Sequence, residues 1–129
     1  MLVLDSHRTN TALARRAARR FVRASCPWAD ANDVTLVVSE LLGNAVRHAE
    51  GTWLLRMSCR REALVVEVHD SSSTLPVPRA GDPENGGGFG WAIVQQLASS
   101  VTVQPHRAGK AVQAVWRPAP PAPAQAQAA

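Results

Sequence analysis

The sequence predicts an α+β fold, a two-layer sandwich in which one mixed, mostly antiparallel sheet carries three helices on one face. Two segments with apolar residues at helical spacing come first, and pairs of alternating segments joined by short turns follow on either side of a third helical segment. The chain has 129 residues, enough for one domain with one core. This order of elements is typical of a sheet covered by helices on one side.

A short edge strand is expected at residues 2–4, followed by a helix over about 9–25 with Thr9 or Asn10 as its cap. An apolar stripe runs along this helix at helical spacing, formed by Leu13, Ala17, Phe21 and Ala24. Five arginines lie opposite the stripe: Arg15, Arg16, Arg19, Arg20 and Arg23. A solvated face is the first interpretation of these arginines, a docking face for an acidic protein the second, and a DNA-binding surface the third.

The second helix is expected to begin after Asp30 or Asn32, to continue to about Ala49 and to stop at Gly51. The later elements are expected with these bounds: strands 53–60 and 63–69, a loop over 70–88, a helix over 89–99, strands 101–104 and 111–116, and a disordered tail over 118–129. The chain is thus predicted to be one domain over residues 1–117 followed by the tail.

The composition argues against a nucleic-acid-binding, membrane-spanning or secreted protein. The net charge is +4, but thirteen of the fourteen basic residues are arginine, which fits a biased coding composition better than a selected nucleic-acid surface. No apolar run approaches the length of a membrane span, and residues 1–6 are not a secretory leader, so we expect a cytoplasmic protein without a membrane. Cys26 and Cys59 are expected to be reduced, partly buried thiols without a role.

The stretch SELLGNAVRHAE places Glu40 and Asn44 one helical turn apart in an otherwise apolar helix. With Glu40 at zero on a helical wheel, Asn44 falls near about 40° and Arg47 near about −20°. The apolar residues fill the arc from about 60° to 200°, so the acid and the amide lie where the buried stripe meets solvent. A pocket wall and an ordinary surface pair are equally good interpretations of this segment alone.

Two further segments contain residues that could bind a ligand. In VVEVHDSSSTLP an apolar strand ends in Asp70, whose carboxylate can accept a hydrogen bond from an exocyclic amine, although an aspartate that opens a turn is common. In ENGGGFGWAIVQQLA, glycines lead directly into an apolar helix, where backbone N–H groups and the helix dipole suit a phosphate. A flexible hinge is the alternative. The spacing matches neither a dinucleotide-binding motif nor a P-loop.

Together these segments resemble the GHKL superfamily of ATPases and kinases, which includes histidine-kinase catalytic domains, gyrase, Hsp90 and MutL. ELLGNAVRHA resembles its N box, with Glu40 and Asn44 in the E-x-x-x-N positions. DSSSTLP, which ends at Pro76, resembles the first glycine box, and GGGFGWAIV the second. The resemblance covers about residues 9–117 and implies a histidine kinase-like ATP-binding domain with the Bergerat fold. The glutamate is most similar to that of the anti-sigma factor serine/threonine kinase branch.

The resemblance implies ATP and Mg²⁺ as ligands. Asn44 would ligate the Mg²⁺ that bridges the phosphates, and Glu40 would act as general base or orient the attacking hydroxyl of a protein substrate. Asp70 would hold the adenine amine, and His48, at a position where the family often has histidine, would support the helix end beside the nucleotide. The second glycine box would wrap the phosphates beneath a lid over residues 71–87: Gly86, Gly87, Gly88, Phe89 and Gly90.

The sequence departs from the family pattern at three places. Ser72 replaces the usual glycine of the first box but is small enough to leave room for adenine. Lys110 stands in a segment where the family often offers a threonine near the adenine. In the lid, Arg79 is the only basic residue. These departures bear more on turnover than on nucleotide binding.

Two functions follow from the resemblance. The first is an ATP-dependent serine/threonine kinase that acts on an anti-sigma factor antagonist. The second is a catalytically weak or inactive switch that binds a sigma factor or antagonist in a nucleotide-dependent way. A histidine-kinase-like domain with a separate phosphoacceptor ranks third because Glu40 argues against it, and direct nucleic-acid binding ranks last. A homodimer is possible, because the family commonly dimerises.

Overall fold

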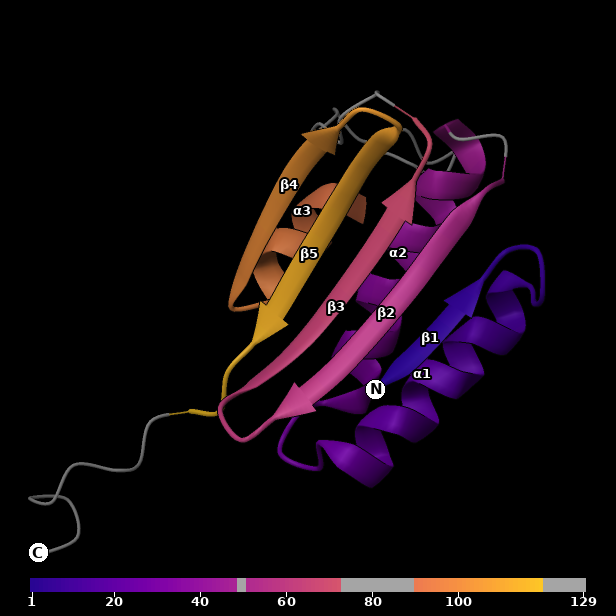
Figure 1. Ribbon diagram of the computed structural model, residues 1–129. Helices are drawn as coiled ribbons and strands as arrows, with labels where there is room; N and C mark the ends of the chain where they lie inside the picture. Colours follow the sequence, from indigo (N-terminus) through magenta and orange to yellow (C-terminus); the bar gives the residue numbers. More distant parts are fainter. Residues whose placement is uncertain (49–50, 73–89, 120–129) are drawn as a thin grey trace, which may run out of the picture.

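The computed structural model describes residues 1–48, 51–72 and 90–119, and it confirms the α+β sandwich. One sheet has the strand order β1-β2-β3-β5-β4, and the helices lie on one of its faces (Figure 1). Each pairing of neighbouring strands in this part of the chain is antiparallel, where a mixed sheet was expected. The elements are β1 Leu2–Asp5, α1 Thr11–Ser25, α2 Ala31–His48, β2 Trp53–Arg60, β3 Ala63–Asp70, α3 Gly90–Leu97, β4 Ser100–His106 and β5 Gly109–Trp116.

Both long helices begin at residues that the sequence offered as caps. The side chain of Asn10 accepts the N–H of Leu13 at 2.9 Å and starts α1. Asp30 Oδ1 accepts the N–H groups of Asn32 and Asp33 at 2.8 and 3.1 Å, and α2 follows. These bonds satisfy amide groups that have no partner within the helix, which is why each helix starts where it does.

The buried face of α1 differs from the predicted stripe. Leu13 is 49% exposed and Ala24 is exposed, while Phe21 packs against the core from one side. The centre of the contact instead consists of small side chains, which are fully buried: Ala14, Ala18 and Val22. Small residues let α1 approach α2 closely, so packing rotated the helix away from the phase that its larger apolar residues indicated.

The arginines of α1 divide into two groups. Arg15 Nη1 lies 3.5 Å from Ser39 Oγ, and Arg19 Nη1 donates to Asn32 Oδ1 at 2.9 Å, so these two cover the seam between α1 and α2. The other three are exposed: Arg16, Arg20 and Arg23. The predicted arrangement of one solvated arginine face is therefore only partly right.

Alternate residues of each strand face the helices and form the core. On the central strand β3 these are Leu64, Val66, Val68 and Asp70, and on β5 they are Lys110, Val112, Ala114 and Trp116. Apart from Asp70 and Lys110, these side chains belong to one buried apolar cluster with α1, α2 and Val94 of α3. A carboxylate and an ammonium therefore occupy one end of an otherwise apolar layer.

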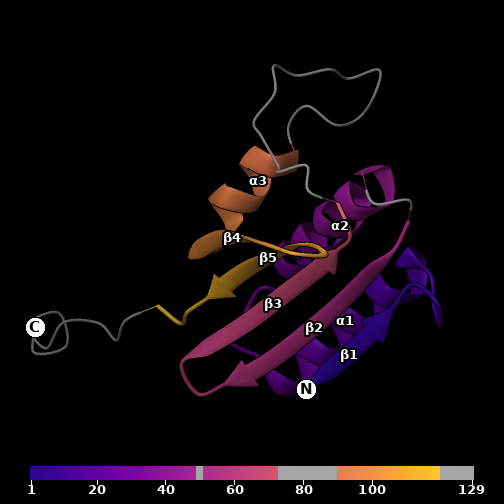
Figure 2. The ribbon, with the colours of Figure 1, turned by 45° about the horizontal axis from the view of Figure 1, so that its top comes forward.

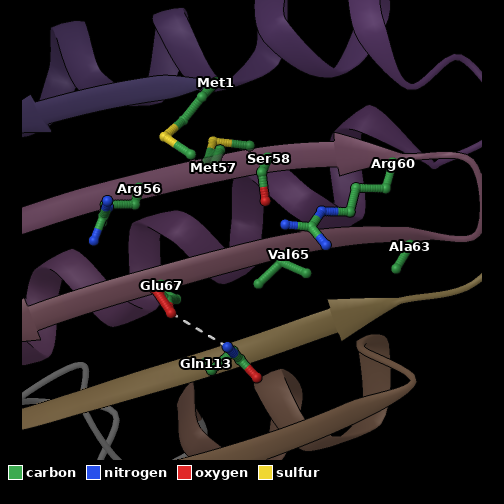
Figure 3. Close-up of a pocket in the computed structure, with 9 residues that line it drawn as sticks. All are labelled: Met1, Arg56, Met57, Ser58, Arg60, Ala63, Val65, Glu67 and Gln113. Atoms are coloured by element: carbon green, nitrogen blue, oxygen red, sulfur yellow. Dashed lines mark hydrogen bonds between the residues drawn. The ribbon is translucent and has the colours of Figure 1, made fainter.

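The opposite face of the sheet carries no described helix and has both polar and apolar side chains, among them Glu67, Gln113 and Val65. It has a shallow depression of about 460 Å³, lined by residues of β2, β3 and β5 together with Met1 (Figure 3). Within it, Gln113 donates to Glu67 at 3.3 Å, and the Arg60 side chain extends over the strands. This depression lies on the far side of the sheet from Asp70, so it is separate from the predicted nucleotide site.

None of the described helices combines the length and apolar character that a membrane span requires. Both cysteines are free thiols. Cys26, which follows α1, is fully buried rather than partly buried as expected, and Cys59 on β2 is half-buried. Burial, then a hydrogen bond with Cys59 and the charge of that residue, raise the pKa of the Cys26 thiol to about 12.

This raised pKa predicts a pH-dependent stability. The ordinary value for the thiol is 9.0, so the folded chain binds the proton of Cys26 more tightly than the unfolded chain does. The stabilisation is therefore complete below about pH 9 and is lost as the pH rises towards 12. Urea unfolding of wild type and Cys26→Ala from pH 8 upward should show the difference between them shrinking above about pH 9. A difference that stays constant would contradict the assignment.

Candidate functional site

Segments distant in the sequence meet at one end of the sheet. Helix α2 ends at His48, and β2 begins a few residues later at Trp53, which pairs with Asp70 at the end of β3. Asp70 pairs in turn with Lys110 near the start of β5. Figures 1 and 2 show the ends of α2 and β3 and the start of β5 at this same end. The topology thus places the end of α2, which carries Asn44, close to the end of β3, which carries Asp70.

A buried ion pair lies at this end of the sheet. Lys110 Nζ is 3.0 Å from both Oδ1 and Oδ2 of Asp70, and the two side chains are only 2% and 3% exposed. The N–H of Ser72 donates to Asp70 Oδ1 at 2.9 Å, and Ser72 is itself buried. A charge taken out of water needs such partners, and here the carboxylate is fixed in position by an ammonium and a backbone amide.

Gly109 allows the two strands to approach at this point. Its φ is +150°, and a Cβ atom added to it would lie 1.9 Å from the carbonyl oxygen of Asp70 and 2.7 Å from Cα of Ser71. Only a residue without a side chain fits against the backbone there. The sequence prediction placed Gly109 and Lys110 in the hairpin turn, whereas the structure assigns both to β5.

The carboxylate of Glu40 lies against the first residue of α3. A Cβ atom added to Gly90 would lie 2.1 Å from Oε2 and 2.9 Å from Cδ of Glu40, so the helix backbone is in direct contact with the acid. The first N–H groups of a helix have no partner within it, and its dipole favours an anion at this end. Glu40 is half-buried, which matches the predicted border between the core and solvent.

Asn44 also lies at this border, and its carboxamide already has a partner. Arg47, about one turn further along α2, donates to Asn44 Oδ1 through Nη2. Because Arg47 is exposed, its side chain can leave this oxygen without disturbing the core.

The donor atoms fit a Mg²⁺ that arrives with a nucleotide. Mg²⁺ prefers oxygen ligands and usually takes one or two from the protein and the rest from phosphates and water. Asn44 supplies such an oxygen, and the carboxylate of Glu40 lies one turn away. The described residues hold no group of three His, Cys, Asp or Glu side chains that could bind a metal. They therefore suit a nucleotide-borne Mg²⁺ better than a metal held by the protein alone.

The structure describes six of the eleven predicted site residues. Glu40, Asn44 and the exposed His48 lie on α2, Asp70 and Ser72 lie at the end of β3, and Gly90 begins α3. Five predicted residues lie outside the described part of the chain: Pro76, Gly86, Gly87, Gly88 and Phe89. Within the described part, the structure brings Glu40 into contact with Gly90, the first residue of α3.

The sequence analysis missed Lys110 as a site residue. A signal was present, because Lys110 is the only lysine of the chain and stands at a position that alternates with Val112, Ala114 and Trp116. A charged residue in the inward register of a strand requires a buried counter-charge. Asp70, at the end of another strand and also in the inward register, provides it.

Comparison with protein families gives an independent result. The model of the histidine kinase-like ATPase domain matches residues 4–116, which is nearly the whole described chain. The match spans both the α2 segment with Glu40 and Asn44 and the pair of Asp70 with Lys110. The search of curated proteins found no match.

Proposed function

Because the chain belongs to the histidine kinase-like ATPase domain family, we propose that it is an ATP-binding regulator of the anti-sigma factor type. In this proposal it transfers the γ-phosphoryl group of ATP to a serine or threonine of an anti-sigma factor antagonist. Membership of this family supports ATP as the ligand. The observation that supports the proposed phosphoryl transfer is the contact between Glu40 and Gly90.

In the proposed step Glu40 accepts the proton of the substrate hydroxyl. The hydroxyl oxygen forms a bond to the γ-phosphorus, and the bond from that phosphorus to the β,γ-bridging oxygen breaks and leaves its electron pair on ADP. The N-terminus of α3, which lies against Glu40, supplies amide donors for the developing charge. Asn44 would hold the Mg²⁺, which neutralises phosphate charge when bound, and Arg47 would release Oδ1 at that moment.

The exposed arginines of α1 support an acidic protein as the partner. Arg16, Arg20 and Arg23 point to solvent, and α1 has no acidic residue. Such a surface attracts a protein of opposite charge and orients it during the encounter. The partner in this proposal is a sigma factor or its antagonist, bound through an acidic face.

The experiment uses γ-labelled ATP, the purified chain and total protein from its source organism. The chain should add label to serine or threonine of one acidic protein, and Glu40→Gln should lower the rate by about 10²- to 10⁴-fold, because a general base is lost. The matched control is Glu62→Gln, in the exposed turn between β2 and β3, which should retain the wild-type rate. Gly90→Ala, whose methyl group displaces the Glu40 carboxylate, should resemble Glu40→Gln.

A second function is favoured by the contact of Arg47 with Asn44. Since the guanidinium occupies the oxygen that would ligate Mg²⁺, nucleotide binding and the position of Arg47 are coupled, as in a binding switch without turnover. The same assay separates the two functions. No labelled protein, together with a partner affinity that changes on adding ATP, would favour the switch. Wild-type transfer by Glu40→Gln would reject Glu40 as the base.

A further inference from the structure

We propose that Lys110 reads the base of the nucleotide together with Asp70, by donating a hydrogen bond to N1 of adenine. The inference rests on the proposed function, since it takes the base to lie against Asp70. Lys110 is the only lysine in a chain with thirteen arginines, and its ammonium is buried against the carboxylate. This residue would be a specificity determinant in addition to the aspartate.

The ion pair does not use the whole hydrogen-bonding capacity of Asp70 and Lys110 among the described residues. Among the described residues, Asp70 Oδ1 accepts hydrogen bonds from Lys110 and from the N–H of Ser72, whereas Oδ2 contacts Lys110 alone. A carboxylate oxygen has two acceptor sites and an ammonium has three N–H donors. With one N–H on each carboxylate oxygen, Lys110 keeps one donor, for which the described residues supply no acceptor. Within residues 1–48, 51–72 and 90–119, the pair therefore leaves one acceptor site of Oδ2 and one donor of Lys110 without a partner.

Adenine complements this arrangement along one edge. Its exocyclic amine can donate to Oδ2 of Asp70, and its neighbouring ring nitrogen N1 can accept from Lys110. Guanine and inosine carry an oxygen in place of the amine and a hydrogen on N1, so they would set an oxygen against the carboxylate and an N–H against the ammonium. An ammonium cannot accept a hydrogen bond, whereas a hydroxyl or a water can reverse its role. Lys110 therefore sharpens the selection of adenine over these bases.

The test compares nucleotides on the wild-type chain by calorimetry. ATP should bind, and 1-deaza-ATP, in which a C–H group replaces N1, should bind about 10- to 100-fold more weakly because the buried ammonium loses its acceptor. ITP should bind more weakly still. Equal affinities for ATP and 1-deaza-ATP would overturn the role of Lys110 and leave the proposed function standing. Failure of ATP itself to bind would overturn both.

Variants separate this contact from a general effect of charge. In Lys110→Met the difference between ATP and 1-deaza-ATP should disappear. The matched control is Arg107→Met, which removes an exposed cation from the turn of the same hairpin and should preserve the difference. Near-ultraviolet circular dichroism establishes that each variant is folded before titration. If Lys110→Met does not fold, the nucleotide series on the wild-type chain decides.

Discussion

Replacing Lys110 by alanine is expected to lower the free energy of unfolding by about 3 to 5 kcal/mol, because the buried carboxylate of Asp70 loses its counter-charge. Both oxygens of Asp70 contact the ammonium at 3.0 Å, and the carboxylate is only 3% exposed, so water replaces little of the lost contact. Urea unfolding at neutral pH measures the loss. For a domain of this size a loss of that magnitude is a large fraction of the total stability.

Two controls show whether the effect comes from an unpaired charge. Arg107→Ala, which removes an exposed cation, should change stability by less than about 0.5 kcal/mol. The double variant Asp70→Asn with Lys110→Met should recover most of the loss, since replacing both buried charges removes the uncompensated one. A loss below about 1 kcal/mol for Lys110→Ala would show that water or another group compensates Asp70.

The second large effect is expected at Gly109. Alanine there should destabilise the fold by about 2 to 5 kcal/mol, since its methyl group would overlap the backbone of Asp70 and Ser71 and its φ of +150° is strained for any side chain. The overlap is with backbone atoms, so a side-chain rotation cannot relieve it. The thermal unfolding midpoint measures the change and should fall by more than about 10 °C.

Gly43 provides the matched control for the substitution at Gly109. It lies within α2, and an added Cβ would come no closer than 3.6 Å, to the end of the Arg47 side chain. Gly43→Ala should therefore leave stability unchanged or raise it by up to about 1 kcal/mol, because alanine favours a helix. Equal losses at Gly43 and Gly109 would mean that the close approach of β5 to Asp70 is not what makes Gly109 necessary.

Local signals predicted most of the secondary structure. The caps Asn10 and Asp30, the turn at residues 61–62 and the alternation of β2 and β3 depend on neighbours a few residues apart, and all are confirmed. The packing phase of α1 was wrong because Ala14 and Ala18 carry almost no hydrophobic signal. They are buried because α2 packs on that side, and nothing within α1 encodes this.

The residues of the candidate site also divide into those that local signals predict and those that depend on tertiary packing. Glu40, Asn44 and Asp70 could be selected from the sequence because each is a polar residue that interrupts an apolar pattern at the end or edge of its own element. That selection used only the period of a helix or a strand. The roles of Asn44 and Asp70 towards a nucleotide remain predictions, and the residues before Gly90 that are predicted to bind phosphate lie outside the described part of the chain.

By itself, then, the sequence determined the elements, their order and the polar residues that stand out within them, since these follow from backbone hydrogen bonding and side-chain periodicity over one or two turns. Only the tertiary structure decided that Lys110 neutralises Asp70 and that Gly90 lies against Glu40. These contacts join residues forty or more positions apart. They depend on strand register and helix packing, and no local preference fixes either.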